Sequence, residues 1–479
     1  MRLQCKKGTG NIIKSSSDRL GTPLVIAALM CSALLVTTAR ASSLINPEPE
    51  DSTTRFGQSV AVIGDINGDG VPDLAVGTPF QDGDFDPGNG FGPPQDVGKV
   101  WLISGAGLGV IRQLNDPFFQ VPRSFPKFGS FTGFSVASAG DLNGDGKTDV
   151  LVGVPHHSNF DLDHINAGEA FVFSGANGSV VFTLTDPDED EGDRMGYAVA
   201  GLGDVNGDGV RDLLVGIPKK DSEDGLLKDI GRALVFSGAN GSIIRTLNPP
   251  DQGGAEANGR FGTAVADAGD VNHDGVDDIL IGAPGDSRAY VFNGATGALI
   301  FTINNPSAPS QEKLPSFGAA VAGGQDLDGD GTPDFVIGAP LQSNLRGAAY
   351  TFKGSNGTLL RSLRGPRQAF GEFGASVAVS PDVTGDGRPD VLVGAPDVTV
   401  NGLQNAGQVF VFRASNGRLS RTLSSEGPTG FAGFGFAVTT GNFTGTPQIV
   451  IGVPFQDKDL VDPDGDIHTH LQIGQIEIQ

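Results

Sequence analysis

One pattern constrains the fold of this chain more than any other: an acidic loop that runs directly into an apolar strand and ends at a proline. The first copy is GDINGDGVPDLAVGTP, from Gly64 to Pro79. Full-length copies begin again at Gly140, Gly203, Gly269, Gln325 and Pro381. A seventh copy, GNFTGTPQIVIGVP from Gly441, is two residues shorter. A chain written in such repeats builds its domain from repeated units.

The six full-length loops, numbered one to six in chain order, carry oxygen-bearing side chains at fixed spacing. Aspartate occupies positions 1, 5 and 9, glycine position 6, and Asn, Asp or Thr position 3. Carboxylate, amide and carbonyl oxygens on a sharply turning loop suit calcium, whereas magnesium would keep more water. An isolated run of this kind often means only a turn, but a turn does not require the carboxylate at position 9.

We therefore predict about six calcium ions, with the backbone carbonyl of position 7 as a further ligand. The predicted ligands are Asp65, Asn67, Asp69, Val71, Asp73, Asp141, Asn143, Asp145, Lys147, Asp149, Asp204, Asn206, Asp208, Val210, Asp212, Asp270, Asn272, Asp274, Val276, Asp278, Asp326, Asp328, Asp330, Thr332, Asp334, Asp382, Thr384, Asp386, Arg388 and Asp390. An EF-hand would need a glutamate at position 12 on a helix, where these repeats have strand residues such as Val76. The short seventh loop keeps only Asn442 and Thr444 and is predicted to bind no metal.

The first 41 residues differ from the rest. Basic residues precede an apolar run from Pro23 to Val36, and Ala39-Arg40-Ala41 follows, which is the composition of a secretory signal. We predict a signal peptide over residues 1–41 and a secreted or cell-surface protein. The apolar run of about 14 residues is shorter than the roughly 20 that span a membrane. Both cysteines, Cys5 and Cys31, lie in this segment, so calcium would have to stabilise the mature chain in place of disulfides.

The formal net charge of −24 makes nucleic acid and anionic membranes poor partners. Much of this acidity lies in the predicted calcium loops. We expect a monomer with no membrane span.

The repeats predict an all-β fold. Their closing prolines lie 56 to 76 residues apart, which leaves room for four short strands. The first strand follows an FG pair, the second follows the acidic loop, the third reads like GEAFVFS from Gly168, and the fourth follows a turn such as Asn177-Gly178. The second and third strands are almost entirely apolar and the fourth is mixed, as expected for an inner and an outermost strand.

We therefore predict a seven-bladed β-propeller of four-stranded blades over residues 42–479. The predicted blades span about 55–114, 131–184, 194–247, 260–303, 316–363, 372–423 and 433–479, the last completed by 42–47. The sequence ends on a third strand, and SSLINPEPED from Ser42 resembles the fourth-strand endings. Residues 43–46 are thus predicted to close the ring. A linear stack of repeats is the alternative and would need caps at both ends.

An FG pair, the D-x-[DN]-x-D-G-x-x-D loop and an apolar strand ending in Gly-Ala-Pro together resemble the FG-GAP repeat. This repeat is found in integrin alpha-chain propellers, in bacterial secreted FG-GAP proteins and in the propeller part of glycosylphosphatidylinositol-specific phospholipase D. The resemblance implies that the loop Asp and Asn residues bind calcium and that the chain is adhesion-like. We expect no integrin leg, inserted domain or phospholipase domain here. The second repeat has Thr132-Gly133 in place of Phe-Gly, and Thr384 predicts a weaker sixth site.

The longest connections, Phe80–Val97, Asn115–Thr132 and Phe455–Ile473, are predicted to share the rim opposite the acidic loops. They carry Phe80, Phe85, Phe91, Phe118, Phe119, Phe125, Phe128 and Phe131 beside Asp82, Asp84, Asp86, Asp457, Asp459, Asp462, Asp464 and Asp466. This corner is either a partner surface or a set of loops that pack their own aromatics. Asp462, Asp464, Asp466, His468 and His470 either form a transition-metal site or a flexible acidic loop.

The sequence contains no G-x-S-x-G or H-E-x-x-H motif, although the His156-His157 pair stands on the predicted functional rim. The favoured function is a secreted calcium-binding propeller that acts as an adhesion-like binding module for a protein or glycan partner. The alternative is a calcium-dependent extracellular hydrolase or lyase with a site at the propeller centre. The balance of motifs favours a protein that is not an enzyme.

Overall fold

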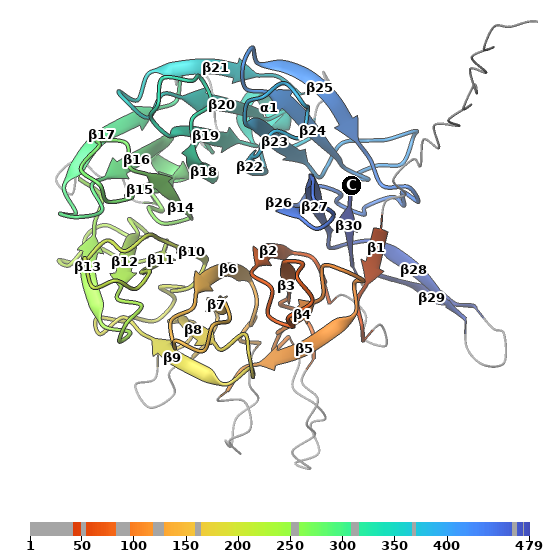
Figure 1. Ribbon diagram of the computed structural model, residues 1–479, viewed down its shortest axis with the longest axis horizontal. Coiled ribbons are helices and arrows are strands. Elements are labelled where there is room, and N and C mark those ends of the chain that lie inside the picture. The colour runs from red at the N-terminus through yellow and green to blue at the C-terminus, as the bar shows by residue number, and fades with distance from the viewer. Residues whose placement is uncertain are drawn as a thin grey trace, which may run out of the picture. The chain divides into compact units, whose positions relative to one another are not determined.

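The strands predicted from the repeats form seven antiparallel four-stranded sheets arranged as the blades of a ring in the computed structural model (Figure 1). The structure describes residues 42–48, 54–82, 96–117, 129–158, 164–250, 258–307, 316–365, 370–461, 467–472 and 474–479. These lie in one unit, Ala41–Gln479. The predicted signal segment lies outside the described residues.

Each blade is listed from its innermost to its outermost strand. Blades one and two are β2 (Ser59–Ile63), β3 (Asp73–Thr78), β4 (Lys99–Ile103) and β5 (Val110–Asn115), then β6 (Ser135–Gly140), β7 (Asp149–Val154), β8 (Glu169–Phe173) and β9 (Val180–Leu184). Blades three and four are β10 (Ala198–Gly201), β11 (Leu213–Ile217), β12 (Arg232–Phe236) and β13 (Ile243–Leu247), then β14 (Ala264–Gly269), β15 (Asp278–Ala283), β16 (Arg288–Phe292) and β17 (Leu299–Asn304). Blades five and six are β18 (Ala320–Gln325), β19 (Asp334–Ala339), β20 (Ala348–Phe352) and β21 (Leu359–Leu363), then β22 (Ser376–Ser380), β23 (Asp390–Ala395), β24 (Gln408–Arg413) and β25 (Arg418–Leu423). Blade seven is β26 (Ala437–Asn442), β27 (Pro447–Val453), β30 (Gln475–Ile478) and β1 (Ser42–Ile45).

Burial follows the hydrophobic gradient of the sequence. Second strands such as β3 and β7 are buried along their whole length, whereas fourth strands such as β9 combine exposed and partly buried residues with one buried residue at the end. The apolar clusters of the core lie between successive blades, as where Val152 and Phe171 of blade two pack with Ala75 and Val100 of blade one. Each blade therefore buries both of its faces against its neighbours.

The glycines of the FG pair and of the Gly-x-Pro ending explain how the blades approach so closely. A β-carbon added to Gly216 of blade three would lie 2.1 Å from the carbonyl oxygen of Gly262, the FG glycine of blade four. The same contact recurs at all seven junctions, including the one between Gly452 and Gly57, at 2.0 Å. These glycines recur because no side chain fits between the backbones.

The N-terminal strand closes the ring as predicted. β1 pairs with β30, from Ser42 opposite Ile478 to Ile45 opposite Gln475. The innermost strands β26 of blade seven and β2 of blade one are neighbours, as in the other blade pairs. The seventh junction is thus built like the other six, and this excludes a linear stack.

Two features of the connections were not predicted. The segment expected to be a long flexible loop between β27 and β30 contains a hairpin, β28 (Asp457–Val461) paired with β29 (Ile467–Gln472). The only helical turns among the described residues are η1 (Pro284–Asp286) and α1 (Gln342–Leu345). No helix in the described part of the chain is long and apolar enough to cross a membrane.

Candidate metal centres

The six acidic loops share one hydrogen-bonded geometry, which loop one illustrates. The carboxylate of Asp65 accepts backbone N–H bonds from Gly68, Asp69 and Gly70 at 2.6, 3.1 and 2.8 Å. The N–H of Gly70 contributes most to holding the pKa of Asp65 below its ordinary value. At position 5, Asp69 accepts the N–H of Val71, the position 7 residue, at 2.9 Å. The chain is thereby wrapped around its own acidic side chains.

The position 9 aspartate differs from the others because it is fully buried in every loop. Asp73, Asp149, Asp212, Asp278, Asp334 and Asp390 have no exposed surface. In loop one, Asp73 Oδ2 accepts the N–H of Ile66 at 2.9 Å and Oδ1 that of Gly105 at 3.1 Å. Burial raises the pKa of Asp149, Asp278 and Asp334 to about 6. A buried carboxylate of this kind is stabilised by a nearby cation.

The turn between the third and fourth strands also contributes to each loop, and sequence reasoning missed this contribution. In blade one, Ser104 donates its hydroxyl to Asp69 Oδ2 at 3.1 Å, next to the N–H bond from Gly105 to Asp73. The equivalent donors to position 5 in blades two to four are Ser174, Ser237 and Asn293, and in blades five and six the donors are Ser355 and Ser415, two residues later in the turn. The repeated Ser-Gly-Ala after the third strand, as at Ser174-Gly175-Ala176, was the available signal.

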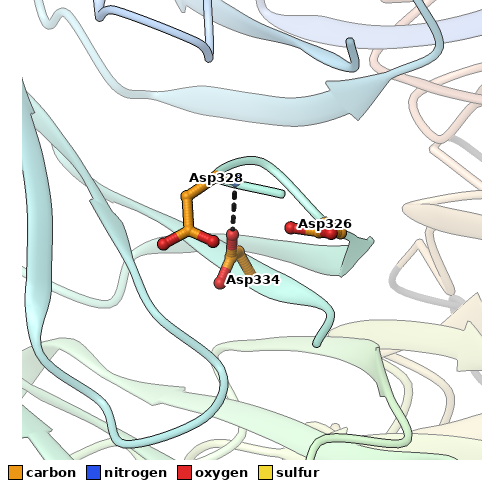
Figure 2. Close-up of side chains that lie close together, drawn as sticks. All are labelled: Asp326, Asp328 and Asp334. Carbon is orange, nitrogen blue, oxygen red and sulfur yellow. Dashed lines mark hydrogen bonds between the residues drawn. The ribbon is translucent and has the colours of Figure 1, made fainter. Parts of the chain in front are cut away.

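Loops five and six bring three carboxylates closest together among the described residues. Oxygen atoms of Asp326, Asp328 and Asp334 lie within 4.8 Å of one another, and so do those of Asp382, Asp386 and Asp390. Figure 2 shows the first group, with the N–H of Asp328 donating to Asp334 at 3.1 Å. In loop six, Thr384 at position 3 donates its hydroxyl to Asp390 at 3.1 Å.

In the other four loops an asparagine amide lies among the carboxylates. Asn67 donates to Asp69 at 2.9 Å and to Asp73 at 3.4 Å, and Asn143 donates to Asp149 at 3.1 Å. Turning the amide would present its oxygen instead. Once the amides are turned, every side-chain atom that could ligate a metal is an oxygen, and one carboxylate per loop is buried. The residues therefore fit a hard divalent cation.

Neighbouring loops are also joined to one another. Lys147, at position 7 of loop two, donates to the backbone carbonyl of Asp65 in loop one at 2.9 Å. His273 of loop four lies 3.2 Å from the hydroxyl of Thr332 in loop five. The side chains of position 7 thus connect successive loops. In the short seventh loop, the Thr444 and Thr446 hydroxyls lie 3.4 Å apart, and that it binds no metal stays a prediction.

The rim at the other ends of the strands, here called the opposite rim, carries a chain of stacked rings in blades seven, one and two. Arg55 lies over the rings of Phe80 and Phe455, at 4.0 and 5.0 Å. Phe80 contacts Phe131, with ring centroids 4.6 Å apart, and Phe131 contacts His156 at 4.4 Å. We call these five residues the aromatic sector.

Most of the other residues predicted for the partner surface lie outside the part of the chain that the structure describes. Phe85, Phe91, Phe118, Phe119, Phe125, Phe128, Asp84, Asp86, Asp462, Asp464 and Asp466 lie outside the described residues. Asp457, Asp459, His468 and His470 are in β28 and β29, whose side chains are not described. The additional transition-metal site therefore stays a prediction.

Two residues of the aromatic sector stand at special backbone positions. Arg55 directly precedes the FG pair of blade one, and Phe131 precedes the Thr-Gly pair that replaces it in blade two. Their φ angles are 56° and 60°. Arg194, Arg260 and Glu372 occupy the same position in other blades and have φ between 50° and 61°. In blade seven the residue is Gly433. Large side chains therefore stand where the backbone favours glycine.

The histidine pair on this rim is built into the fold. His156 Nδ1 lies 3.2 Å from Asn166 Oδ1, and burial lowers the pKa of His156 to about 4. His157 Nδ1 lies 3.5 Å from Glu169 Oε1. Both histidines therefore face acceptors that fix their positions.

The fold and loops define the chain as a β-propeller whose blades carry acidic loops, and comparison with known proteins identifies the family. The FG-GAP repeat model matches residues 56–103, 132–173, 261–299, 317–357 and 373–412. These are blades one, two, four, five and six. The chain belongs to the FG-GAP family of β-propellers that includes integrin alpha chains.

Curated relatives agree with this assignment. The chain is 33% identical to integrin alpha-5 of Xenopus laevis over 226 residues and 35% identical to integrin alpha-V of Gallus gallus over 222 residues. Both alignments cover 44% of this chain and 20% of the relative. Integrin alpha-PS2 of Drosophila melanogaster is 32% identical over 223 residues, which is 15% of its length. The chain thus spans about a fifth or less of these relatives.

Proposed function

We propose that the chain is a secreted, calcium-binding β-propeller that acts as an adhesion-like binding module for a protein or glycan partner. The carrying observation is the sixfold repetition of a loop with a fully buried aspartate at position 9 and more accessible aspartates at positions 1 and 5. A role in turn formation alone does not account for the buried carboxylate, because burying a charge without a cation is costly. Calcium in these loops would hold the first two strands of blades one to six together.

The aromatic sector is the part of the described surface that we propose for partner binding. Its rings are partly exposed, and those of Phe80 and Phe455 lie against Arg55. Aromatic and arginine side chains of this kind dominate binding energies at protein interfaces, and strained backbone positions cluster at binding sites. The resemblance to integrin alpha chains supports an adhesive role.

Residues 1–41 would direct secretion as a signal peptide. The basic start, apolar run and Ala-x-Ala ending support this part of the proposal. A chain without cysteine beyond residue 41 would then depend on calcium rather than disulfides outside the cell.

The hydrolase or lyase alternative is not favoured. The acidic loops hold their carboxylates in bonds to their own backbone, and His156 and His157 face Asn166 and Glu169. A catalytic metal would need positions open to substrate.

Calcium removal is the first test. Residues 42–479 are dialysed against calcium buffer, analysed for bound metal, and unfolded thermally with calcium and with chelator. A site filled at a hundred times its Kd stabilises by about 2.7 kcal/mol, so loss of several ions should lower Tm by roughly 10 to 20 °C. About six ions per chain support the proposal. No bound calcium and an unchanged Tm would refute it.

Partner binding is tested separately on arrays of extracellular proteins and glycans in calcium buffer. The parent is compared with Phe80→Ala/Phe455→Ala and with a control, Val110→Ala/Leu359→Ala. The control also removes two apolar side chains, 47% and 44% exposed, but from the outer strands. Binding lost only in the first variant supports the aromatic sector, and equal binding by all three would exclude it.

A further inference from the structure

Loop five differs from loops one to four by an additional carboxylate at position 3 and by a cation at the start of the turn after the third strand. Position 3 is Asp328, where loops one to four have asparagine and loop six has threonine. The turn that follows the third strand begins with Lys353, where blades one to three have serine and blade four has asparagine. The side chains of these two residues contact each other.

The ammonium group of Lys353 lies inside the acidic group of loop five. Its Nζ is 2.5 Å from Asp328 Oδ2 and 3.4 Å from Asp330 Oδ2. The Lys353 side chain is 32% exposed and that of Asp328 is 16% exposed, so solvent screens this pair only in part. Lys353 therefore takes up a fixed position against two predicted calcium ligands.

Lys353 replaces the hydrogen-bond donor that asparagine supplies elsewhere. In loops one and three, the position 3 amide donates to position 5, from Asn67 to Asp69 at 2.9 Å and from Asn206 to Asp208 at 2.8 Å. Asp328 has no such donor when ionised. Lys353 supplies it from the neighbouring turn and adds a positive charge.

The charges of the loop explain why this cation is needed. Loop five has four carboxylates, Asp326, Asp328, Asp330 and Asp334, whereas loops one and three have three. With Lys353 the net charge of loop five becomes equal to that of loop one. Blade six carries the related Arg413, but its Nε lies 4.0 Å from Asp386 Oδ2, at the limit of an ion pair.

We propose that Lys353 is a built-in counter-cation of loop five that competes with calcium for Asp328 and Asp330 and thereby sets the calcium affinity of this loop. The inference rests on the proposed calcium binding and goes beyond it, because it makes one of six similar loops distinct. With Lys353 in place, loop five fills at higher calcium than loops one and three. Filling releases the ammonium group to solvent.

The test measures each loop separately in residues 42–479. Hydrogen–deuterium exchange of peptides covering loops one, three and five is followed over a calcium titration. The parent is compared with Lys353→Ser, which installs the residue of blades one to three, and with Lys353→Arg, which keeps the charge. Removing a unit charge at this distance should lower the loop-five calcium midpoint about tenfold in Lys353→Ser, with loops one and three unchanged. Lys353→Arg should stay within about threefold of the parent.

Asp328→Asn provides the matched control, since it gives loop five the asparagine of loops one to four. In this background Lys353→Ser should shift the midpoint less than threefold. Arg413→Ser should leave loop five unchanged. A similar shift with or without Asp328 would overturn the proposed competition.

Lys353 itself gives a second readout. Its acetylation rate should rise severalfold as loop five fills, while Lys228, which is 68% exposed and pairs with Asp221, should not respond. If calcium protects loops one and three but neither the midpoint nor the Lys353 reactivity responds as stated, the inference on Lys353 fails alone. If calcium protects no loop, the proposed calcium function fails, and this inference with it.

Discussion

The two rims of the propeller differ in what they repeat. On the acidic-loop rim, six loops present nearly the same side chains in the same hydrogen bonds, down to the buried aspartate at position 9. On the opposite rim, equivalent positions carry Arg55, Phe131, Arg194, Arg260 and Glu372 in blades one to four and six, with similar backbone angles. One rim repeats its side chains, while the other repeats only its backbone.

This difference separates stability from recognition. A side chain that a full-length loop needs for its own fold must recur in every such loop, as the position 9 aspartate does in six blades. A side chain that varies at a fixed backbone position is free to serve one local purpose. We therefore expect substitutions in repeated features to affect stability most, and substitutions on the opposite rim to affect binding more than stability.

The largest effect is expected at the repeated glycines between blades. Gly216→Ala would place a β-carbon 2.1 Å from the carbonyl oxygen of Gly262, so the blades would have to separate. We expect a loss of more than about 4 kcal/mol, or failure to fold. Gly107→Ala is the control, because no atom lies within 4 Å of its added β-carbon, and it should change stability by less than about 0.5 kcal/mol. Equal denaturant midpoints for the two variants would contradict the close-contact explanation.

The second effect separates buried from exposed carboxylates within one loop. Without calcium, Asp212→Ala leaves the N–H groups of Val205 and Gly238 without their acceptor. This should cost about 3 kcal/mol of unfolding free energy. Asp208→Ala removes an exposed carboxylate and should cost about 1 kcal/mol or less. Both variants should lose one calcium ion in elemental analysis. Equal stability losses in denaturant titrations would show that burial does not distinguish these positions.

Sequence reasoning predicted the features that each repeat contains within itself. The strand order, the acidic loops and the closing β1 strand all followed from spacing and from the apolar pattern. What it missed lies between segments far apart in the chain. Arg245 of blade three donates to the carbonyls of Gly294 and Ala295 in the turn of blade four, but the sequence shows only an arginine in a mixed strand. Such contacts depend on how far one blade is offset from the next, which local patterns do not encode.

The β28–β29 hairpin was missed for a different reason. Its segment contains the run DPDGD, which indicates a turn and an acidic loop, and no neighbouring repeat has a counterpart. The positive φ angles before the FG pairs were likewise hidden, because arginine and phenylalanine do not indicate left-handed backbone. Sequence repetition thus predicts the structural features that all blades share, but it does not predict a feature that only one blade has.

A smaller effect is expected from pH on the opposite rim. The pKa of His156 is lowered to about 4 by burial, from about 6.5 in the unfolded chain. As pH falls, the unfolded state therefore takes up a proton before the folded state does. The contribution of neutral His156 to stability is complete above pH 6.5 and is lost as pH falls toward 4. After allowance for partial exposure, we expect about 1 kcal/mol. His156→Phe, which keeps a ring against Phe131, should unfold like the parent at pH 8 and be relatively more stable at pH 4.5. A constant difference across this range would argue against a buried neutral histidine.

The smallest change in stability is expected at Arg55, where the two rims are distinguished most directly. Arg55→Gly removes the contacts with Phe80 and Phe455, which contribute about 1 kcal/mol at a partly buried site. It also removes the strain of a β-carbon at φ of 56°, about 1–2 kcal/mol, while glycine makes the unfolded chain more flexible by about 0.4–1 kcal/mol. These terms nearly cancel, so Tm should change by less than about 2 °C. Partner binding on the arrays should nevertheless be lost, because the only cation of the aromatic sector is gone. A variant that loses several degrees of Tm and keeps full binding would show that Arg55 serves the fold. The side chains of the opposite rim would then be as constrained by stability as those of the acidic-loop rim.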